Sequence, residues 1–274
     1  MATVYIAPTA QGSGNGTNAA NAYAYSSLSS AETDAGTGGT IIFLDGTYSA
    51  GATQTWDAPQ VTYESQTLHG AIIDGGSVNR QLVYQDNTVK KFFFKEFRFN
   101  WSTASTGTAT FEDIKVKCAV AFGVSNNPGY FGGNALGKDQ NWTRCEFDLD
   151  VSASTGTDNR FFKTSSSVMV YNHCTFYLRT SGASADAFVT TGTNLTFKNT
   201  ILEATDATTF GTAFNFASNG TNCCIHNVDN NTSGGTNNVF SDPLFVDSAN
   251  SDLRLRPSLL ASTLLLPKSW HSKS

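Results

Sequence analysis

Charged side chains are scarce in this chain of 274 residues. Asp, Glu, Lys and Arg make up only 14% of it, and 22 acidic against 17 basic residues give a net charge of -5 at pH 7. An acidic balance argues against a broad phosphate-binding face, so we expect no nucleic-acid partner. Few segments carry the residues that favour helices, whereas Ser, Thr, Asn and Gly dominate the polar positions. This composition favours an all-β protein with many turns.

Long apolar runs and paired cysteine motifs are also missing. No apolar run reaches about 18 residues, so we expect no membrane span. The start, MATVYIAPTAQGSG, lacks the basic and apolar stretches of a signal peptide, which favours synthesis in a cytoplasm. No C-x-x-C pair occurs, which argues against zinc and predicts buried free thiols at Cys118, Cys145, Cys174, Cys223 and Cys224. Adjacent Cys223 and Cys224 should point to opposite faces of a strand.

A short pattern recurs from residue 94 onward: an apolar residue, two mostly polar ones, then two apolar or small positions separated by one residue. Its instances are FKEFRF from Phe94, FEDIKV from Phe111, WTRCEF from Trp142, YNHCTF from Tyr171, FKNTIL from Phe197 and CIHNVDN around Ile225. Successive starts are 17, 31, 29, 26 and 28 residues apart, and most of these spacings are typical of one turn of a coil. Clusters of Gly, Ser, Thr and Asn between them supply turns. The repeats therefore predict short strands stacked along one axis.

Alignment of the repeats predicts which side chains share a column of the stack. Two columns should face inward, one with Ile114, Cys145, Cys174, Thr200 and Val228 and another with Val116, Phe147, Phe176 and Leu202. The charged residues between them should face outward and pair between neighbouring coils: Lys115 with Glu146, Lys117 with Asp148, and Asp150 with Arg179. Such neighbours lie about 5 Å apart in a parallel stack, so opposite charges help modestly.

One acidic segment is a candidate metal site. EFDLD places Glu146, Asp148 and Asp150 on one face, as oxygen ligands for Ca²⁺ would require. The three basic groups expected on neighbouring coils would repel such an ion. We therefore interpret the segment as part of a charge ladder and expect no metal or other cofactor, with calcium as the alternative if the protein is a lyase.

Both ends of the sequence resemble a known family. The N-terminal stretch VYIAPTAQGSGNGTNAANAYAYSSLSSAETDAGTGGTIIFLDGTYSAG contains a strand at residues 4–6, a Gly-rich turn at 12–16, a short helix at about 26–35, and a strand at 41–48 that ends in Gly-Thr-Tyr. Near the other end stands VFSDPLFVDSANSDLRLRPS, residues 239–258. These stretches resemble the opening and the close of right-handed parallel β-helix proteins of the pectate-lyase-like superfamily. The resemblance spans about residues 2–257 and leaves the activity open.

The resemblance implies a single right-handed parallel β-helix in three parts. Residues 1–40 should form a strand, a turn and a capping helix, residues 41–257 the coil, and residues 258–274 an apolar tail. In the closing coil, Asp242, Asp247 and Asp252 should serve as turn formers. The tail consists of Ser258 followed by LLASTLLLPKSWHSKS. Many relatives continue at this point with Pro-Ala-Ile-Asp, which this tail lacks. We expect it to cap the open end of the coil or to pack on a partner chain of a homo-oligomer, for instance a trimer.

Candidate catalytic residues are few. The resemblance implies an Arg or Lys base beside calcium-binding Asp residues in lyases, and Asp pairs near a His in hydrolases. The basic candidate is TGTDNRFFK, where Asp158, Arg160 and Lys163 are close in sequence, although it also fits a turn and strand start in solvent. His173 and His226 occupy comparable places before an inward column, which favours a turn or core role.

Aromatic residues in predicted loops are the better hint of function. Trp56, Trp101, Tyr130 and Phe131 lie in or near such loops, the last two within NNPGYFGGN. Sugar rings stack on aromatic faces, so these four are candidate carbohydrate-binding residues. For that Gly-rich loop the alternative is a segment folded over the coil with both rings buried.

Two classes of function follow. The first is a non-enzymatic module of a viral particle, such as a tail spike or decoration on the virion surface, which contacts other virion proteins and binds host polysaccharide. The second is a polysaccharide lyase or glycoside hydrolase. We favour the first, because no carboxylate cluster suited to catalysis is identified in the sequence.

Overall fold

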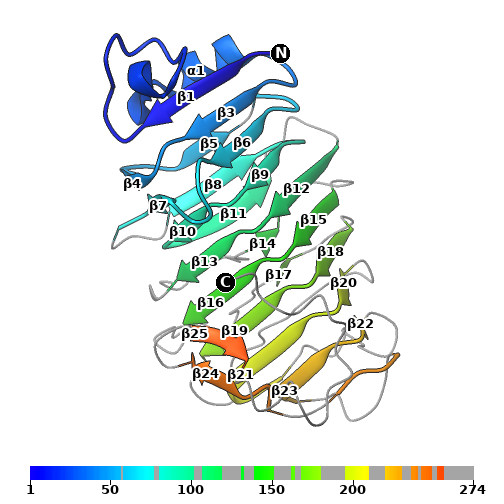
Figure 1. The fold of residues 1–274 in the computed structure, drawn as a ribbon. Helices are drawn as coiled ribbons and strands as arrows, with labels where there is room; N and C mark the ends of the chain where they lie inside the picture. Colours follow the sequence, from blue (N-terminus) through cyan, green and yellow to red (C-terminus); the bar gives the residue numbers. More distant parts are fainter. Residues whose placement is uncertain are drawn as a thin grey trace.

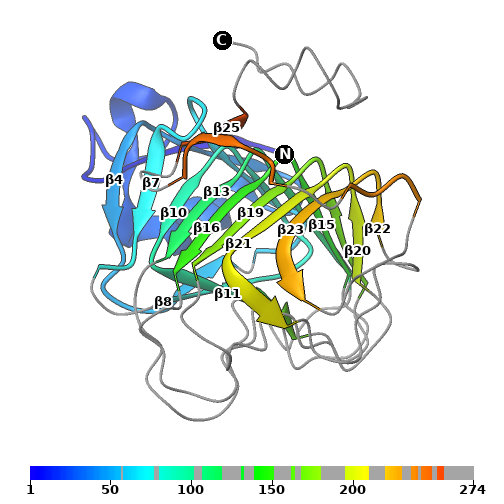
Figure 2. The ribbon, with the colours of Figure 1, turned by 90° about the horizontal axis from the view of Figure 1, so that it is seen from below.

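Parallel strands stacked coil upon coil form the body of the protein in the computed structural model (Figure 1). Figure 2 looks along this stack from its C-terminal end. The structure describes residues 1–56, 58–76, 80–101, 107–118, 131–132, 139–150, 162–163, 168–179, 195–209, 220–229, 236–239, 242–248 and 252–255. The chain is a right-handed parallel β-helix, which confirms the fold expected from the repeats and the resemblance.

Among the described residues, three sheets form the walls of the helix, and the strand pairs within them are parallel. The ten-stranded sheet contains β1 (Thr3–Ala7), β2 (Tyr23–Ala24), β3 (Thr40–Phe43), β6 (Thr62–Ser65), β9 (Thr88–Lys90), β12 (Thr108–Glu112), β15 (Asp139–Thr143), β18 (Met169–Asn172), β20 (Leu195–Lys198) and β22 (Gly220–Thr221). The eight-stranded sheet contains β4 (Gly46–Ser49), β7 (Ala71–Asp74), β10 (Phe93–Lys95), β13 (Lys115–Cys118), β16 (Glu146–Asp150), β19 (Thr175–Arg179), β21 (Ile201–Thr209) and β23 (Cys224–Asp229). The five-stranded sheet contains β5 (Gln54–Trp56), β8 (Arg80–Tyr84), β11 (Phe97–Trp101), β14 (Phe131–Gly132) and β17 (Phe162–Lys163).

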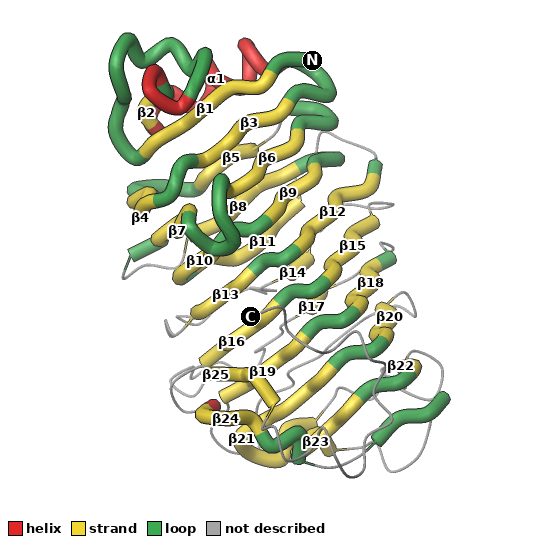
Figure 3. The backbone as a smooth tube through the Cα atoms, in the orientation of Figure 1, coloured by secondary structure: helices red, strands yellow, loops and turns green. Residues whose placement is uncertain are grey.

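A short helical cap covers the N-terminal end of the stack (Figure 3). It consists of η1 (Ala19–Asn21), η2 (Tyr25–Ser27) and α1 (Leu28–Ala35), close to the helix expected at 26–35. The helix α1 buries Ala31 and Ala35 against the first coil and ends at Gly36, whose φ of 64° suits glycine. Among the described residues, no helix is long and apolar enough to span a membrane.

In-register stacking of apolar side chains fills the interior. The predicted inward column of Val116, Phe147, Phe176 and Leu202 is confirmed, and all four residues are fully buried. Parallel pairing places equivalent rings one above another, so Phe147 and Phe176 stack with centroids 4.4 Å apart and planes 6° apart. Such stacks make each coil depend on its neighbours for a buried core.

A column of residues in the left-handed backbone conformation turns the chain from the ten-stranded into the eight-stranded sheet. Their φ angles lie between 49° and 65° at Lys91, Asp113, Arg144, His173, Asn199 and Asn222. The turn role expected for His173 is therefore confirmed. Asn tolerates this conformation well, and the Asn199 amide also donates to Asn172 Oδ1 at 3.0 Å while Asn222 donates to Asn199 at 3.1 Å.

The residue after each of these corners points inward, which corrects two parts of the repeat alignment. The buried corner column is Ile114, Cys145, Cys174, Thr200 and Cys223, so the expectation for Val228 was wrong. The repeat at Phe94 was also out of register, because Phe94 pairs with Val116 and the coil partner of Phe111 is Val89. That slip accounts for the short spacing of 17 residues.

The stretch after the last coil folds back on the outside of the β-helix. Its strands β24 (Phe245–Asp247) and β25 (Asp252–Leu255) form an antiparallel hairpin. Phe245 and Leu253 pack on Tyr177, Ile201 and Cys224, which point outward from the eight-stranded sheet. The interpretation of this stretch as a closing coil was therefore wrong. The tail at 258–274 lies outside the described residues.

All five cysteines are free and buried, as predicted. Cys223 lies in the main core, whereas Cys224 belongs to the outer cluster beneath the hairpin. The two thiols therefore face opposite sides of the sheet, as strand geometry requires.

Candidate functional site

The outer face of the eight-stranded sheet carries a continuous column of polar side chains, one from each coil. In register order the column contains Ser49, Asp74, Lys95, Lys117, Asp148, Tyr177, Glu203 and His226. Side chains at alternate positions of each strand point inward, so this face presents a row of polar groups at the spacing of the coils.

The middle of this face is a ladder of ion pairs. Lys115 Nζ lies 2.6 Å from Glu146, Lys117 Nζ 3.8 Å from Asp148, and Arg179 3.8 Å from Asp150. These are the three pairs that the sequence predicted. Each of the three carboxylates considered as calcium ligands thus has a cationic partner, which opposes binding of a further cation.

The Asp148 carboxylate is the most deeply placed member of the ladder. Its side chain is fully buried, and Arg179 donates to its Oδ1 at 2.5 Å. Arg179 also lies over the ring of Tyr177, with its Cζ 5.2 Å from the ring centroid. A buried carboxylate needs such a partner, because an unpaired charge away from water is costly.

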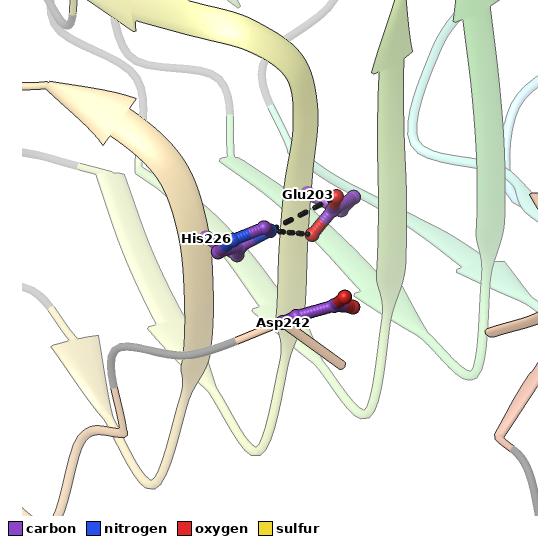
Figure 4. Close-up of side chains that lie close together, drawn as sticks. All are labelled: Glu203, His226 and Asp242. Carbon is purple, nitrogen blue, oxygen red and sulfur yellow. Dashed lines mark hydrogen bonds and ion pairs between the residues drawn. The ribbon is translucent and has the colours of Figure 1, made fainter. Parts of the chain in front are cut away.

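A second cluster lies at the C-terminal end of the same column (Figure 4). It consists of Glu203 on β21, His226 on β23, and Asp242 between the last coil and the hairpin. His226 Nδ1 lies 3.1 Å from Glu203 Oε1 and 2.9 Å from Oε2. One ligand atom from each of the three residues lies within 4.8 Å of the other two.

Strand register and the return of the chain bring these three residues together. Glu203 and His226 are direct partners in the parallel pair β21–β23. Asp242 follows the last bridge of the coil, and its Oδ1 accepts a hydrogen bond of 2.6 Å from the Leu244 N–H. Phe245 then enters the outer apolar cluster, which holds this segment against the sheet. The site therefore depends on both the coil and the hairpin.

Burial and a neighbouring charge make Glu203 an unusual carboxyl group. Burial raises the pKa of Glu203 to about 7, the hydrogen bond and charge of His226 lower it, and the Asp242 carboxylate raises it. The Glu203 side chain is 12% exposed, the His226 side chain 30%, and Asp242 is exposed. A carboxyl group poised near neutral pH beside an imidazole can exchange protons or bind a cation.

Sequence reasoning missed this cluster because of the register slip described above. It placed His226 before an inward column and gave Asp242 only a turn role, which Asp242 does perform through Leu244. Aligning NTILE at 199–203 with NCCIH at 222–226 would have paired Glu203 with His226. The position of Asp242 had no comparable signal, because the return of the chain is not part of the repeat.

The carbohydrate-binding and catalytic candidates from the sequence lie only partly among the described residues. Trp56 is fully buried and stacks on Tyr63 at 4.8 Å, so the expectation that it meets a sugar was wrong. Trp101, Phe131 and Lys163 belong to strands β11, β14 and β17 of the five-stranded sheet. The remaining three, Tyr130, Asp158 and Arg160, lie outside the described residues.

A cavity of about 850 Å³ lies at the opposite, N-terminal end of the outer face. It is bordered by α1 and η2 on one side and by β4 and β5 on the other, and hydroxyl groups dominate its lining. Thr47 and Ser49 contribute from β4, and Glu32 from α1. The ring of Tyr25 also lines the cavity and packs edge-on against Tyr48. No Lys, Arg or His is among the described residues that line it.

Comparisons with known proteins find similarity of structure only. No protein-family model matches the sequence, and no curated protein matches it. Pectin methylesterase PemA from Erwinia chrysanthemi is similar with a TM-score of 0.53 and 9% identity, over 88% of this chain and 81% of that one. A crystal structure of pectin methylesterase in complex with hexasaccharide VII gives a TM-score of 0.54 and 10% identity over the same shares. Pectate lyase Pel9A gives 0.47 and 15%, over 87% of this chain and 66% of that one. At these identities the likeness shows the fold alone.

Proposed function

We propose that this pectate-lyase-like β-helix binds a neutral polysaccharide along the outer face of its eight-stranded sheet. The observation that carries the proposal is the cavity of about 850 Å³ at the N-terminal end of that face. Its volume falls in the range of about 300 to 1,000 Å³ that is usual for ligand sites. Hydroxyl and carboxamide side chains such as Ser49 and Gln54 can exchange hydrogen bonds with sugar hydroxyls, and Tyr25 offers part of an aromatic ring.

The charges around the cavity favour a neutral glycan over an acidic one. Glu32 is the carboxylate in the lining, and the Tyr63 hydroxyl donates to it at 2.6 Å. An acidic sugar would meet this negative charge without a basic partner among the described lining residues, whereas a neutral sugar can donate its hydroxyls to it. A similar fold binds a hexasaccharide in the pectin methylesterase complex, which supports a glycan ligand in general.

Binding without catalysis fits this cavity best. Hydrolysis of a glycosidic bond ordinarily needs two carboxyl groups about 5 to 10 Å apart, and the described lining residues include one, Glu32. The proposal includes the setting expected from the sequence: a non-enzymatic tail-spike or surface-decoration module that assembles as a homo-oligomer. Mass photometry tests the proposed homo-oligomer, and a monomer at micromolar concentration would contradict it.

A panel of oligosaccharides tests the choice of ligand. Isothermal titration with neutral oligosaccharides of four to eight units should give saturable binding, whereas oligogalacturonides of equal length should not bind. Reducing-end assays on the same mixtures should show no cleavage. Binding of the acidic series alone would contradict a neutral ligand.

A second candidate function is hydrolysis of a glycosidic bond at the other end of the face. The observation that favours it is the pair of carboxyl groups on Glu203 and Asp242 beside His226, with the pKa of Glu203 near 7. New reducing ends that disappear in Glu203→Gln would establish this activity. Their absence across neutral and acidic polysaccharides would remove it.

A further inference from the structure

We propose that Glu203, His226 and Asp242 form a site for a divalent transition-metal ion, Zn²⁺ by preference, which fastens the closing hairpin to the β-helix. The three residues offer one imidazole nitrogen and two carboxylates from separate segments of the chain. This role goes beyond glycan binding, because the cavity proposed for the glycan lies at the other end of the outer face.

The spacing of the donor atoms suits a small cation. Two ligand bonds of about 2.0 to 2.2 Å that meet at the tetrahedral angle place a nitrogen and an oxygen about 3.4 Å apart. His226 Nδ1 and Glu203 Oε2 are hydrogen-bonded at 2.9 Å, so an ion between them needs the two atoms to move apart by only about 0.5 Å. Asp242 lies within 4.8 Å of both and is exposed, so a rotation of its side chain brings an oxygen to the same ion.

The local charge also favours a cation. Two carboxylates, Glu203 and Asp242, lie close together here, with ligand atoms within 4.8 Å of each other and of His226. Arg179, on the adjacent strand β19, is already paired with Asp148 and Asp150. Among the described residues, His226 is therefore the one basic partner of Glu203, and a divalent ion would compensate both carboxylates.

The donor set selects among metals. Imidazole is a ligand for Zn²⁺ and its transition-metal neighbours, whereas Ca²⁺ takes six to eight oxygen ligands. With one nitrogen and two carboxylates, the cluster matches a tetrahedral zinc site whose fourth position holds water. We therefore expect Zn²⁺ to bind much more tightly than Ca²⁺.

Binding would have a mechanical consequence at the end of the coil. Glu203 and His226 belong to consecutive coils, whereas Asp242 leads into the hairpin through the buried Pro243. The hairpin is otherwise held through a small apolar cluster that includes Phe245 and Leu253. An ion shared by the three side chains adds a second attachment, and it stabilises the folded state in proportion to its occupancy.

Titration of the chelator-treated protein with ZnCl₂ tests the site. Calorimetry at about pH 7.5 should show one Zn²⁺ per chain, and thermal unfolding should shift upward by several degrees. His226→Ala and Asp242→Asn should each weaken Zn²⁺ binding by about 100-fold and abolish the thermal shift. CaCl₂ at the same concentration should produce neither effect.

Two control variants separate this site from adventitious binding. Asp252→Asn removes a carboxylate from the same hairpin, where Asp252 pairs with Arg254, and should leave zinc binding unchanged. His173→Asn removes a histidine from a corner whose conformation Asn readily adopts, and should also bind zinc normally. Circular dichroism confirms that each variant is folded. Zinc binding that survives both His226→Ala and Asp242→Asn would overturn the proposal, as would equal affinity for Ca²⁺ or no binding to the unmodified protein.

Discussion

His226 Nδ1 lies 3.1 and 2.9 Å from the two carboxylate oxygens of Glu203, and this pair occupies the last two positions of the outward column. Elsewhere on the same face, neighbouring coils pair a carboxylate with Lys or Arg, as in Glu146 with Lys115. An imidazole in place of the permanent cation offers a ring nitrogen of the kind that the proposed metal site requires. Asp242 adds a second carboxylate from outside the coil, so the cluster joins two parts of the fold.

The raised pKa of Glu203 predicts how stability depends on pH. Because its pKa is raised from 4.5 to about 7, the folded protein binds this proton more tightly than the unfolded chain does. The contribution to stability is therefore full at low pH and is lost as the pH rises from 4.5 to about 7. Between about pH 5 and about pH 8 in chelator, Glu203→Gln should gain about 1 to 3 kcal/mol of unfolding free energy relative to the unmodified protein.

Urea unfolding at several pH values measures this difference. Asp242→Asn serves as the matched control. Burial is the main cause of the raised pKa of Glu203, and this variant removes only the smaller repulsion from Asp242 while leaving Glu203 in place. Its pH dependence should be intermediate. Identical pH profiles for Glu203→Gln and the unmodified protein would contradict a raised pKa of Glu203.

The buried ion pair predicts a large cost when one partner is removed. Arg179→Gln leaves the fully buried Asp148 carboxylate without its closest cation, so we expect a loss of about 3 to 5 kcal/mol. Arg179→Gln combined with Asp148→Asn should recover part of that loss. Lys115→Gln breaks a more exposed pair with Glu146 and should cost less than about 1 kcal/mol. Chemical denaturation gives all three values, and equal losses from the two single variants would show that burial of Asp148 is unimportant.

The corner at His173 predicts an unusual order of tolerance. Its φ of 56° is a conformation that Asn accepts and that β-branched residues resist. We expect His173→Asn to change the unfolding free energy by less than about 0.5 kcal/mol, and His173→Val to lower it by about 1 to 2 kcal/mol. Thermal unfolding of the two variants checks the order, and a Val variant as stable as the Asn variant would contradict it.

The hairpin predicts a link between apolar packing and the metal site. Phe245 contacts the ring of Tyr177, with centroids 6.1 Å apart, just beyond the segment that carries Asp242. Phe245→Ala should lower the unfolding free energy by about 2 to 4 kcal/mol and weaken Zn²⁺ binding by about tenfold, because it loosens that segment. Leu68→Ala serves as the control, since Leu68 is exposed. Unchanged zinc affinity in Phe245→Ala would show that the apolar packing does not position Asp242, and would contradict this prediction.

Much of the fold could be predicted because each coil repeats the same sequence pattern. Alternation of apolar and polar residues within short segments placed Val116 and Phe147 inside and Lys117 and Asp148 outside, and opposite charges reported the register between coils. These signals are local or recur at every coil, so one sequence contains many copies of them.

The candidate site could not be predicted in the same way. A misplacement of the last repeat by a few positions moved Val228 into the column of Cys223 and removed His226 from the column of Glu203. The approach of Asp242 depends on a hairpin that leaves the coil and packs through Phe245, and no repeat describes that path. The prediction for Trp56 was wrong for another reason. This tryptophan lies close to a loop, but its ring is buried and stacks on Tyr63.

The glycan-binding cavity is tested most directly by two tryptophan variants in the same titration. Ser49→Trp places a large ring in the cavity, whereas Thr110→Trp makes a similar change on the outward side of β12 in the ten-stranded sheet. The neutral oligosaccharide that binds the unmodified protein should lose at least about tenfold in affinity with Ser49→Trp and keep its affinity with Thr110→Trp. Equal affinity in both variants, with both folded, would contradict glycan binding in this cavity.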